Sequence, residues 1–91
     1  MIKFGDGDIY EGGVKDGKRE GYGKMTYSNG DVYEGEWKCD GRDGKGKMMY
    51  KDNEVYEGEF RSGTRNGYGV LFGKDGEIIY EGIWEKGKIK N

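Results

Sequence analysis

Apolar and charged side chains alternate along much of the chain, so that every second residue shares one face of an extended backbone. In one such segment, Tyr33, Gly35 and Trp37 share one face, whereas Glu34 and Glu36 share the other. This alternation predicts a β-strand with one buried and one solvated face. The Tyr-Glu-Gly sequence recurs at a spacing of 23 or 24 residues, which indicates a repeat array, at Tyr10, Tyr33, Tyr56 and Tyr80.

A second strand is predicted in each repeat, beginning 11 to 13 residues after the tyrosine. It opens with a Gly-x-Gly sequence and continues with alternating side chains, as in Gly23, Met25 and Tyr27. Glycine weakens a strand unless it serves packing. We therefore expect the glycines between bulky residues on the aromatic face to make room for neighbouring rings.

Turn sequences separate the predicted strands. Asp6-Gly7, Asn29-Gly30 and Asp75-Gly76 predict tight hairpin turns because these dipeptides accept positive φ, and Asp52-Asn53 takes the same place in the third repeat. A longer turn is expected at 16–20 and at its equivalents. The extra residue near Ile78 predicts a β-bulge after the turn. Together these elements predict about eight strands in four hairpins, at about 2–15, 22–38, 45–61 and 68–85.

Length and composition predict one thin domain over residues 1–91, with a half repeat at 1–9 and a partial last repeat. Only 32% of the residues are hydrophobic and 20 are glycine, too few large apolar side chains for a thick core. A net charge of −2 provides no general attraction for nucleic acid. The single cysteine, Cys39, and the lack of any apolar run long enough to cross a bilayer predict a cytoplasmic location.

Catalysis is not expected. The chain has no histidine and one cysteine, so it lacks a nucleophile with a base and any thiolate or imidazole metal site. Residues 17–26 are similar to a phosphate-binding loop, but Lys24 is followed by Met25 and no helix is predicted after it. We therefore predict a protein that is not an enzyme and that has no cofactor or metal.

The sequence Tyr33-Glu34-Gly35-Glu36-Trp37, followed by Gly41-Arg42, Gly44-Lys45-Gly46 and an Asn/Asp-Gly turn, resembles the MORN (membrane occupation and recognition nexus) repeat. The chain departs from the pattern at Gly13-Val14, where the family has Glu-Trp, and at Asn53, which replaces glycine. The resemblance implies an all-β fold: an elongated single twisted antiparallel sheet of about four consecutive hairpins, with a groove on one face. It also implies a scaffolding role.

Two interpretations of the aromatic face remain open. The rings pack on one another as a thin core, or they stay partly uncovered, because a single sheet has nothing above that face. In the second case a partner helix or extended segment lies along them. The predicted partner-binding residues are Tyr10, Tyr33, Trp37, Tyr56, Phe60, Tyr80 and Trp84.

A lipid-binding alternative rests on charge. The long turns are expected to form a basic edge, which could face phosphoinositide headgroups at a membrane surface, through Lys18, Arg19, Arg42 and Arg65. Glu20 and Asp43 dilute this charge, so a solvated face is the plainer interpretation. Open sheet edges further predict a homodimer or strand addition by a partner protein, and the family's scaffolding role implies association with the cytoskeleton or a membrane.

Overall fold

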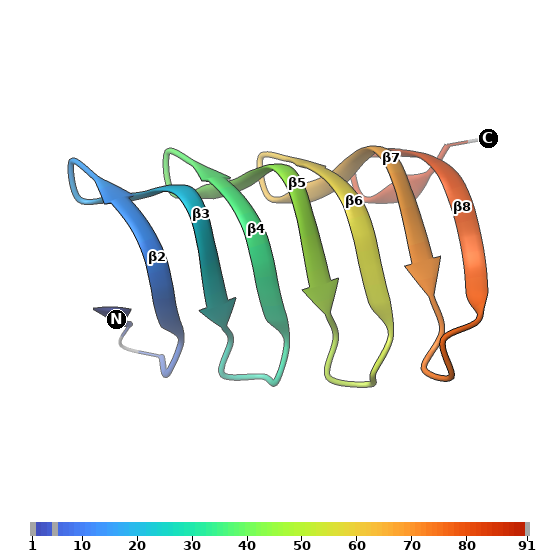
Figure 1. The fold of residues 1–91 in the computed structure, drawn as a ribbon, viewed down its shortest axis with the longest axis horizontal. Coiled ribbons are helices and arrows are strands. Elements are labelled where there is room, and N and C mark those ends of the chain that lie inside the picture. The colour runs from blue at the N-terminus through green and yellow to red at the C-terminus, as the bar shows by residue number, and fades with distance from the viewer. Residues whose placement is uncertain (1, 5, 91) are drawn as a thin grey trace.

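The computed structural model describes residues 2–4 and 6–90, which form one antiparallel sheet of nine strands (Figure 1). The strands are β1 (Ile2–Lys3), β2 (Ile9–Lys15), β3 (Lys18–Thr26), β4 (Val32–Lys38), β5 (Gly41–Met49), β6 (Val55–Arg61), β7 (Thr64–Phe72), β8 (Ile78–Glu85) and β9 (Lys88–Ile89). They lie side by side in chain order, and the molecule measures 38 × 23 × 17 Å. The predicted elongated sheet of consecutive hairpins is confirmed, with β1 and β9 as short additional strands.

The shortest turns of the sheet lie where the long turns were predicted, and the Asn-Gly and Asp-Gly dipeptides lie in slightly longer loops. Where a long turn was expected, two residues suffice: Asp16 and Gly17 both have positive φ (54° and 78°), and Lys15 pairs with Lys18. Positive φ at both positions is typical of a type I′ turn. The same geometry recurs at 39–40, 62–63 and 86–87. The predicted long turns are therefore wrong, and the second strands begin earlier than predicted, at Lys18, Gly41 and Thr64.

The Asn-Gly and Asp-Gly dipeptides lie at the opposite end of the sheet, in three-residue loops. The amide of Gly30 donates to the carbonyl of Tyr27 (3.0 Å), and the amide of Tyr27 donates to the carbonyl of Asp31 (2.8 Å). Gly30 has positive φ (103°), as this type of loop requires at its last position. Asn53 takes this position in the third repeat with a φ of 74°, as predicted.

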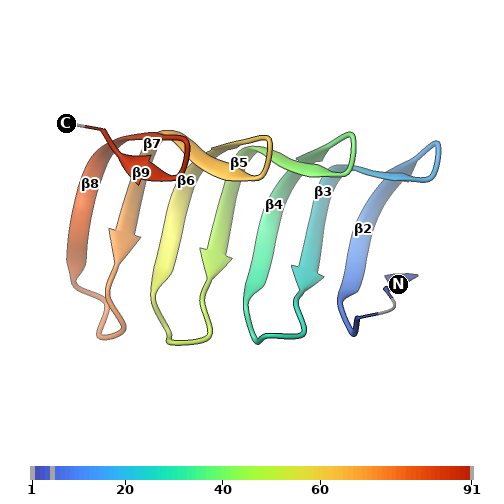
Figure 2. The same cartoon turned by 180° about the vertical axis from the view of Figure 1, so that it is seen from behind.

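A bulge follows each of the first three two-residue turns and bends the sheet. Gly35 pairs with Gly46 and Trp37 with Arg42, so that three residues of β5 lie opposite Glu36 alone. The pairs β2–β3 and β6–β7 have the same shift. Bulges bend a strand and increase its twist, and the strands curve over where they meet the two-residue turns, along the upper side of Figure 1. Figure 2 shows this curved side from behind.

The predicted bulge near Ile78 is also confirmed. Leu71 pairs with Tyr80 and Phe72 with Ile78, which leaves Ile79 as the extra residue in β8. The insertion accounts for the single 24-residue spacing without moving Tyr80 from the face that carries the other tyrosines.

The two faces of the sheet differ in chemistry, and the register shows which residues share each face. Tyr33 lies opposite Met25 and Met48 on one face, here called the aromatic face. On the other face, here called the outer face, Glu34 lies between Lys24 and Lys47. Glutamate and lysine therefore lie side by side across neighbouring strands of the outer face.

Polar bonds tie neighbouring hairpins together at both ends of the sheet. At the loop end, the carboxylates of Asp8 and Asp31 accept hydrogen bonds from the amides of Ser28 (2.8 Å) and Lys51 (2.9 Å), respectively. At the turn end, backbone amides of the turns donate to the preceding strand, as from Gly63 to the carbonyl of Arg42 (2.9 Å). These bonds recur with the repeat and hold the hairpins at a constant spacing.

Candidate functional site

The aromatic rings form the core of the sheet. Tyr10, Tyr33 and Tyr56 have no exposed surface, and Trp37, Phe60 and Trp84 are at most 4% exposed. Neighbouring rings meet edge to face, with centroids 5.0 to 5.4 Å apart, a favourable arrangement for aromatic pairs. Six of the seven predicted partner-binding residues are therefore buried, and the seventh, Tyr80, is partly buried. The expectation that nothing covers this face is wrong, because the bent strands and their side chains cover the rings.

The polar ends of the rings are satisfied within the sheet. The hydroxyl of Tyr33 donates to the carbonyl of Glu36 (2.9 Å), and the hydroxyl of Tyr56 donates to the carbonyl of Glu59 (3.0 Å). The indole of Trp37 donates to the carbonyl of Gly23 (3.1 Å). Burial raises the pKa of Tyr33 well above its usual range and that of Tyr56 to about 12. The rings therefore stabilise the fold and present no free polar group to a partner.

Three arginines lie across the aromatic face and cover the rings; we call Arg19, Arg42 and Arg65 the arginine row. The guanidinium carbon of Arg65 is 4.4 Å from the centroid of Trp84 and 5.9 Å from that of Tyr50. Arg42 is likewise 5.8 Å from both Phe60 and Tyr27. Each arginine thus makes cation–π contacts with buried rings and with a partly buried or exposed ring near the loop end.

The members of the arginine row differ in how their charge is compensated. The Nε atom of Arg19 donates to the carboxylate of Asp40 (2.9 Å), and its terminal nitrogen donates to the carbonyl of Asp40 (2.8 Å). Glycines occupy the position of Asp40 in the next two turns, so Arg42 and Arg65 each reach only a carbonyl there (2.6 and 3.3 Å). Among the residues that the structure describes, no carboxylate lies within 4.0 Å of either guanidinium.

A shallow hollow of about 280 Å³ separates Arg42 from Arg65 on the aromatic face. Its apolar lining comes from Met48, Tyr50 and Phe60. Tyr27, Tyr50 and the arginine row are only partly buried, so another molecule can touch them on this face. Sequence reasoning did not assign Tyr27 and Tyr50 to the site. Their 23-residue spacing, shared by Arg19, Arg42 and Arg65, is the signal that could have found them.

The predicted basic edge does not exist in the form expected. Arg19, Arg42 and Arg65 lie in strands β3, β5 and β7 and not in turns. Their guanidinium groups lie over aromatic rings, and Lys18 alone among the four predicted lipid-binding residues is exposed. The geometry brings the arginines together on the aromatic face, whereas Lys18 is exposed to solvent.

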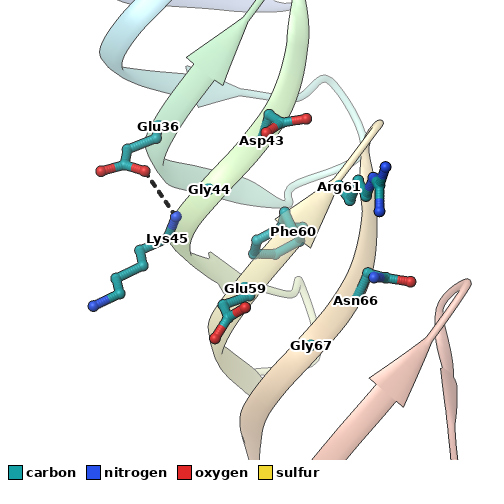
Figure 3. Close-up of a pocket in the computed structure, with 9 residues that line it drawn as sticks. All are labelled: Glu36, Asp43, Gly44, Lys45, Glu59, Phe60, Arg61, Asn66 and Gly67. Atoms are coloured by element: carbon teal, nitrogen blue, oxygen red, sulfur yellow. Dashed lines mark hydrogen bonds between the residues drawn. The ribbon is translucent and has the colours of Figure 1, made fainter.

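A second, larger hollow of about 690 Å³ lies at the bend of β5 and β7 (Figure 3). Its lining is mostly polar, and the Glu36 carboxylate there accepts a hydrogen bond from the amide of Lys45 (3.0 Å). This bond satisfies a backbone amide in the bulge opposite Glu36. The carboxylate therefore has a structural role at the bend.

Other candidate chemistry is limited. Cys39 is exposed in the turn between β4 and β5 and has positive φ (49°). Within residues 2–4 and 6–90, no group of three or more acidic or cysteine side chains is arranged to hold a metal ion. The described part of the chain contains no helix with the length and apolar character needed to cross a membrane.

The comparison with protein families agrees with the geometry of the sheet. The family model of the MORN repeat matches residues 10–32, 33–55, 56–78 and 80–90, and each match begins at one of the four tyrosines. No match was found among curated proteins. MORN repeats are generally involved in binding proteins or membrane lipids. Because the four matches span most of the chain and each corresponds to consecutive strands of the sheet, the protein belongs to the MORN repeat family.

Proposed function

We propose that the protein is a non-catalytic scaffold or adaptor module that holds a helix or extended segment of a partner protein along its aromatic face. The partner contacts the arginine row and the partly buried rings Tyr27 and Tyr50. The buried tyrosines and tryptophans act indirectly, because they form the rigid base on which the arginines lie. A site on rigid strands keeps its shape when it is empty, which lowers the cost of binding.

The observation that carries this proposal is the hollow between Arg42 and Arg65, with two arginines that lack a carboxylate partner in the described chain. A guanidinium group has five N–H donors in a planar fork and binds carboxylates with two parallel hydrogen bonds. Here, one terminal nitrogen of each arginine contacts a backbone carbonyl, at Gly63 or Gly87, so other donors remain.

The lining of the hollow indicates the chemistry of the partner. Met48, Tyr50 and Phe60 form its apolar part, and the two positive charges lie on either side. The Asp31 carboxylate also lines the hollow and accepts a hydrogen bond from the amide of Lys51 (2.9 Å). An acidic segment that carries an apolar side chain between carboxylates fits this arrangement. Arg19 contributes less, because the Asp40 carboxylate already compensates its charge.

The test is affinity capture from a cell lysate with the wild-type chain and with the double variant Arg42→Gln/Arg65→Gln. A matched control, Lys24→Gln/Lys47→Gln, removes two positive charges from the outer face. We expect specific partners to be lost with the arginine variant and retained with the lysine variant. Equal capture by all three proteins, each shown by circular dichroism to be folded, would contradict a site on the aromatic face.

The alternative function is peripheral binding of phosphoinositide headgroups through Lys18 and the arginine row. Sedimentation with vesicles that contain or lack phosphoinositides tests it with the same variants. Binding that is abolished by high salt and by Arg42→Gln/Arg65→Gln would support a lipid ligand in place of an acidic protein segment. We favour the protein partner because the arginines lie over rings, within the curve of the sheet, and not along an exposed edge.

A further inference from the structure

The outer face of the last hairpin, formed by β7 and β8, differs from that of the hairpins before it. One row of register partners crosses the outer face from β2 to β8 and alternates between glutamate and lysine until β7, in the order Glu11, Lys24, Glu34, Lys47, Glu57, Val70 and Glu81. Val70 thus takes the place of a lysine between two glutamates. The repeats provide an internal comparison, because backbone pairing at this position is the same each time.

In the adjacent row of register partners, an apolar residue again replaces a charged one. Tyr22 lies opposite Glu36 and Lys45 lies opposite Glu59, whereas Tyr68 lies opposite Ile83. Ile83 thus occupies the place of a glutamate. With Val70 it forms an apolar group on the outer face of β7 and β8, next to Glu81, whose carboxylate accepts a hydrogen bond from the Tyr68 hydroxyl.

Val70 is half-buried, but most of the apolar side chains around it are exposed to solvent. Tyr68 and Ile83 are each 47% exposed, and Ile78 and Ile79, at the loop end of β8, are 57% and 50% exposed. Single exposed apolar residues need no explanation, but a contiguous group on one hairpin of a highly charged protein indicates an interaction surface.

Glu57 and Glu81 flank Val70 where the earlier hairpins carry a lysine, whereas Glu85 lies opposite Lys88 of β9. The outer side chains of β7 and β8 include Glu81 and Glu85 but no lysine or arginine. The equivalent faces of β3–β4 and β5–β6 each carry both lysine and glutamate. Beside Val70, a second copy of the same surface or an anionic membrane would therefore meet the like charges of Glu57 and Glu81, whereas a basic partner would meet opposite charge.

We propose that the outer face of β7 and β8 binds a short basic amphipathic helix of a partner protein. Its apolar side chains cover Tyr68, Val70 and Ile83, and its lysines or arginines lie beside Glu57 and Glu81. The site is on the opposite face from the arginine row, so it does not depend on the proposed function. The protein would then hold an acidic segment on one face and a basic helix on the other.

The dimensions of the surface set the length of this helix. The row of Tyr68 and the row of Phe72 are four residues apart along β7, or about 13 Å at a rise of about 3.3 Å per residue. At 1.5 Å per residue, a helix of about nine residues covers this distance. Apolar residues at positions i, i+4 and i+7 of such a helix would face the sheet.

The proposal is tested with a synthetic amphipathic peptide of leucine and lysine, about 14 residues long to allow for frayed ends. Backbone amide NMR spectra of the labelled protein are recorded during titration. We expect saturable binding with shifts centred on Tyr68, Val70 and Ile83. The same peptide with glutamate in place of lysine should not bind.

The decisive variant is Val70→Lys/Ile83→Glu, which leaves the net charge unchanged and places on the last hairpin the charges that β5 and β6 carry at Lys47 and Glu59. It should weaken the lysine peptide about tenfold or more. Glu81→Gln, which keeps the apolar surface, should weaken it to a smaller and salt-dependent extent. Arg42→Gln/Arg65→Gln, on the opposite face, should have no effect.

Three results would overturn the proposal. The first is binding of equal strength by Val70→Lys/Ile83→Glu, shown by its spectrum to be folded. The second is a set of shifts centred on Arg42 and Tyr50. The third is self-association or vesicle binding that the same variant abolishes, because either would assign the surface to a second copy or to lipid.

Discussion

The ring of Tyr33 lies so close to Gly46 that a Cβ on this glycine would come within 2.6 Å of the ring carbon Cζ. Gly46→Ala should therefore destabilise the sheet by about 1–3 kcal/mol, the usual cost of forcing an extra methyl group into a packed core. Gly41, in the same strand, is the matched control, because the nearest atom to its Cβ would be 3.7 Å away. Gly41→Ala should be nearly neutral in urea unfolding, and equal losses in both variants would contradict this packing.

Trp37 is a core residue, so truncating its side chain should destabilise the fold, and this loss of stability would mask any direct effect on partner binding. Trp37→Ala should cost about 3–5 kcal/mol in the free energy of unfolding, measured by denaturant titration. Trp37→Phe should cost much less, since Phe60 occupies the equivalent position, although the carbonyl of Gly23 loses its indole donor. Loss of partner capture with Trp37→Ala is therefore informative only alongside Trp37→Phe.

The contact between Arg19 and Asp40 should make the stability depend on acid pH. Hydrogen bonds from the backbone amide and the guanidinium of Arg19 hold the pKa of Asp40 below its ordinary value of 3.8. The stabilisation is therefore fully present above that value and is lost as pH falls through the lower pKa of the folded state. Asp40→Asn should reduce the acid dependence of the urea midpoint. An unchanged acid profile in the variant would show that other carboxylates account for it.

Tyr56 should produce the opposite dependence at alkaline pH. Burial raises its pKa from 10.0 to about 12, so its contribution is present below pH 10 and is lost as pH rises toward the folded-state value. We expect the melting temperature to fall in this range as tyrosinate absorbance appears. Tyr56→Phe should be less stable at neutral pH by about 1 kcal/mol, through loss of the bond to Glu59, but less sensitive to alkali. Parallel alkaline curves for the two proteins would refute this assignment.

Removal of Ile79 should be tolerated, since the residue is an insertion between two paired positions. The deletion restores the 23-residue spacing and should change the free energy of unfolding by less than about 1 kcal/mol, as measured by urea titration. Deletion of Glu81 is the control: it shifts Gly82 and Trp84 by one residue and turns them toward the wrong face. If both deletions were equally harmful, the bulge would have a structural role that its pairing does not reveal.

The face of each first strand could be predicted from the sequence because it depends on local alternation. Tyr33, Gly35 and Trp37 share a face in the structure as their spacing requires. The position of Arg42 could not be predicted in this way. Its place opposite Trp37 depends on a bulge in which three residues of β5 face one residue of β4, and such a shift is set by pairing between strands.

The turn at 16–17 shows why the strand ends were missed. Lys18, Arg19 and Glu20 are polar, as loop residues usually are, but in the sheet they extend β3 beyond the bend. The burial of the rings was missed for the same reason, because a flat sheet without the bend would have left the rings open. A sequence interpretation that placed Arg19 in a strand would have brought it over the aromatic face.

The order of the strands has a consequence for how the molecule unfolds. In the part of the chain that the structure describes, each strand pairs only with its neighbours in sequence, and no distant segment crosses over. Stability in such arrays is approximately a sum of hairpin terms and nearest-neighbour interface terms. Melting should therefore begin at a terminal hairpin and proceed inward, one hairpin at a time. A partner bound across Arg42 and Arg65 would join two neighbouring hairpins and raise the temperature at which that central section unfolds.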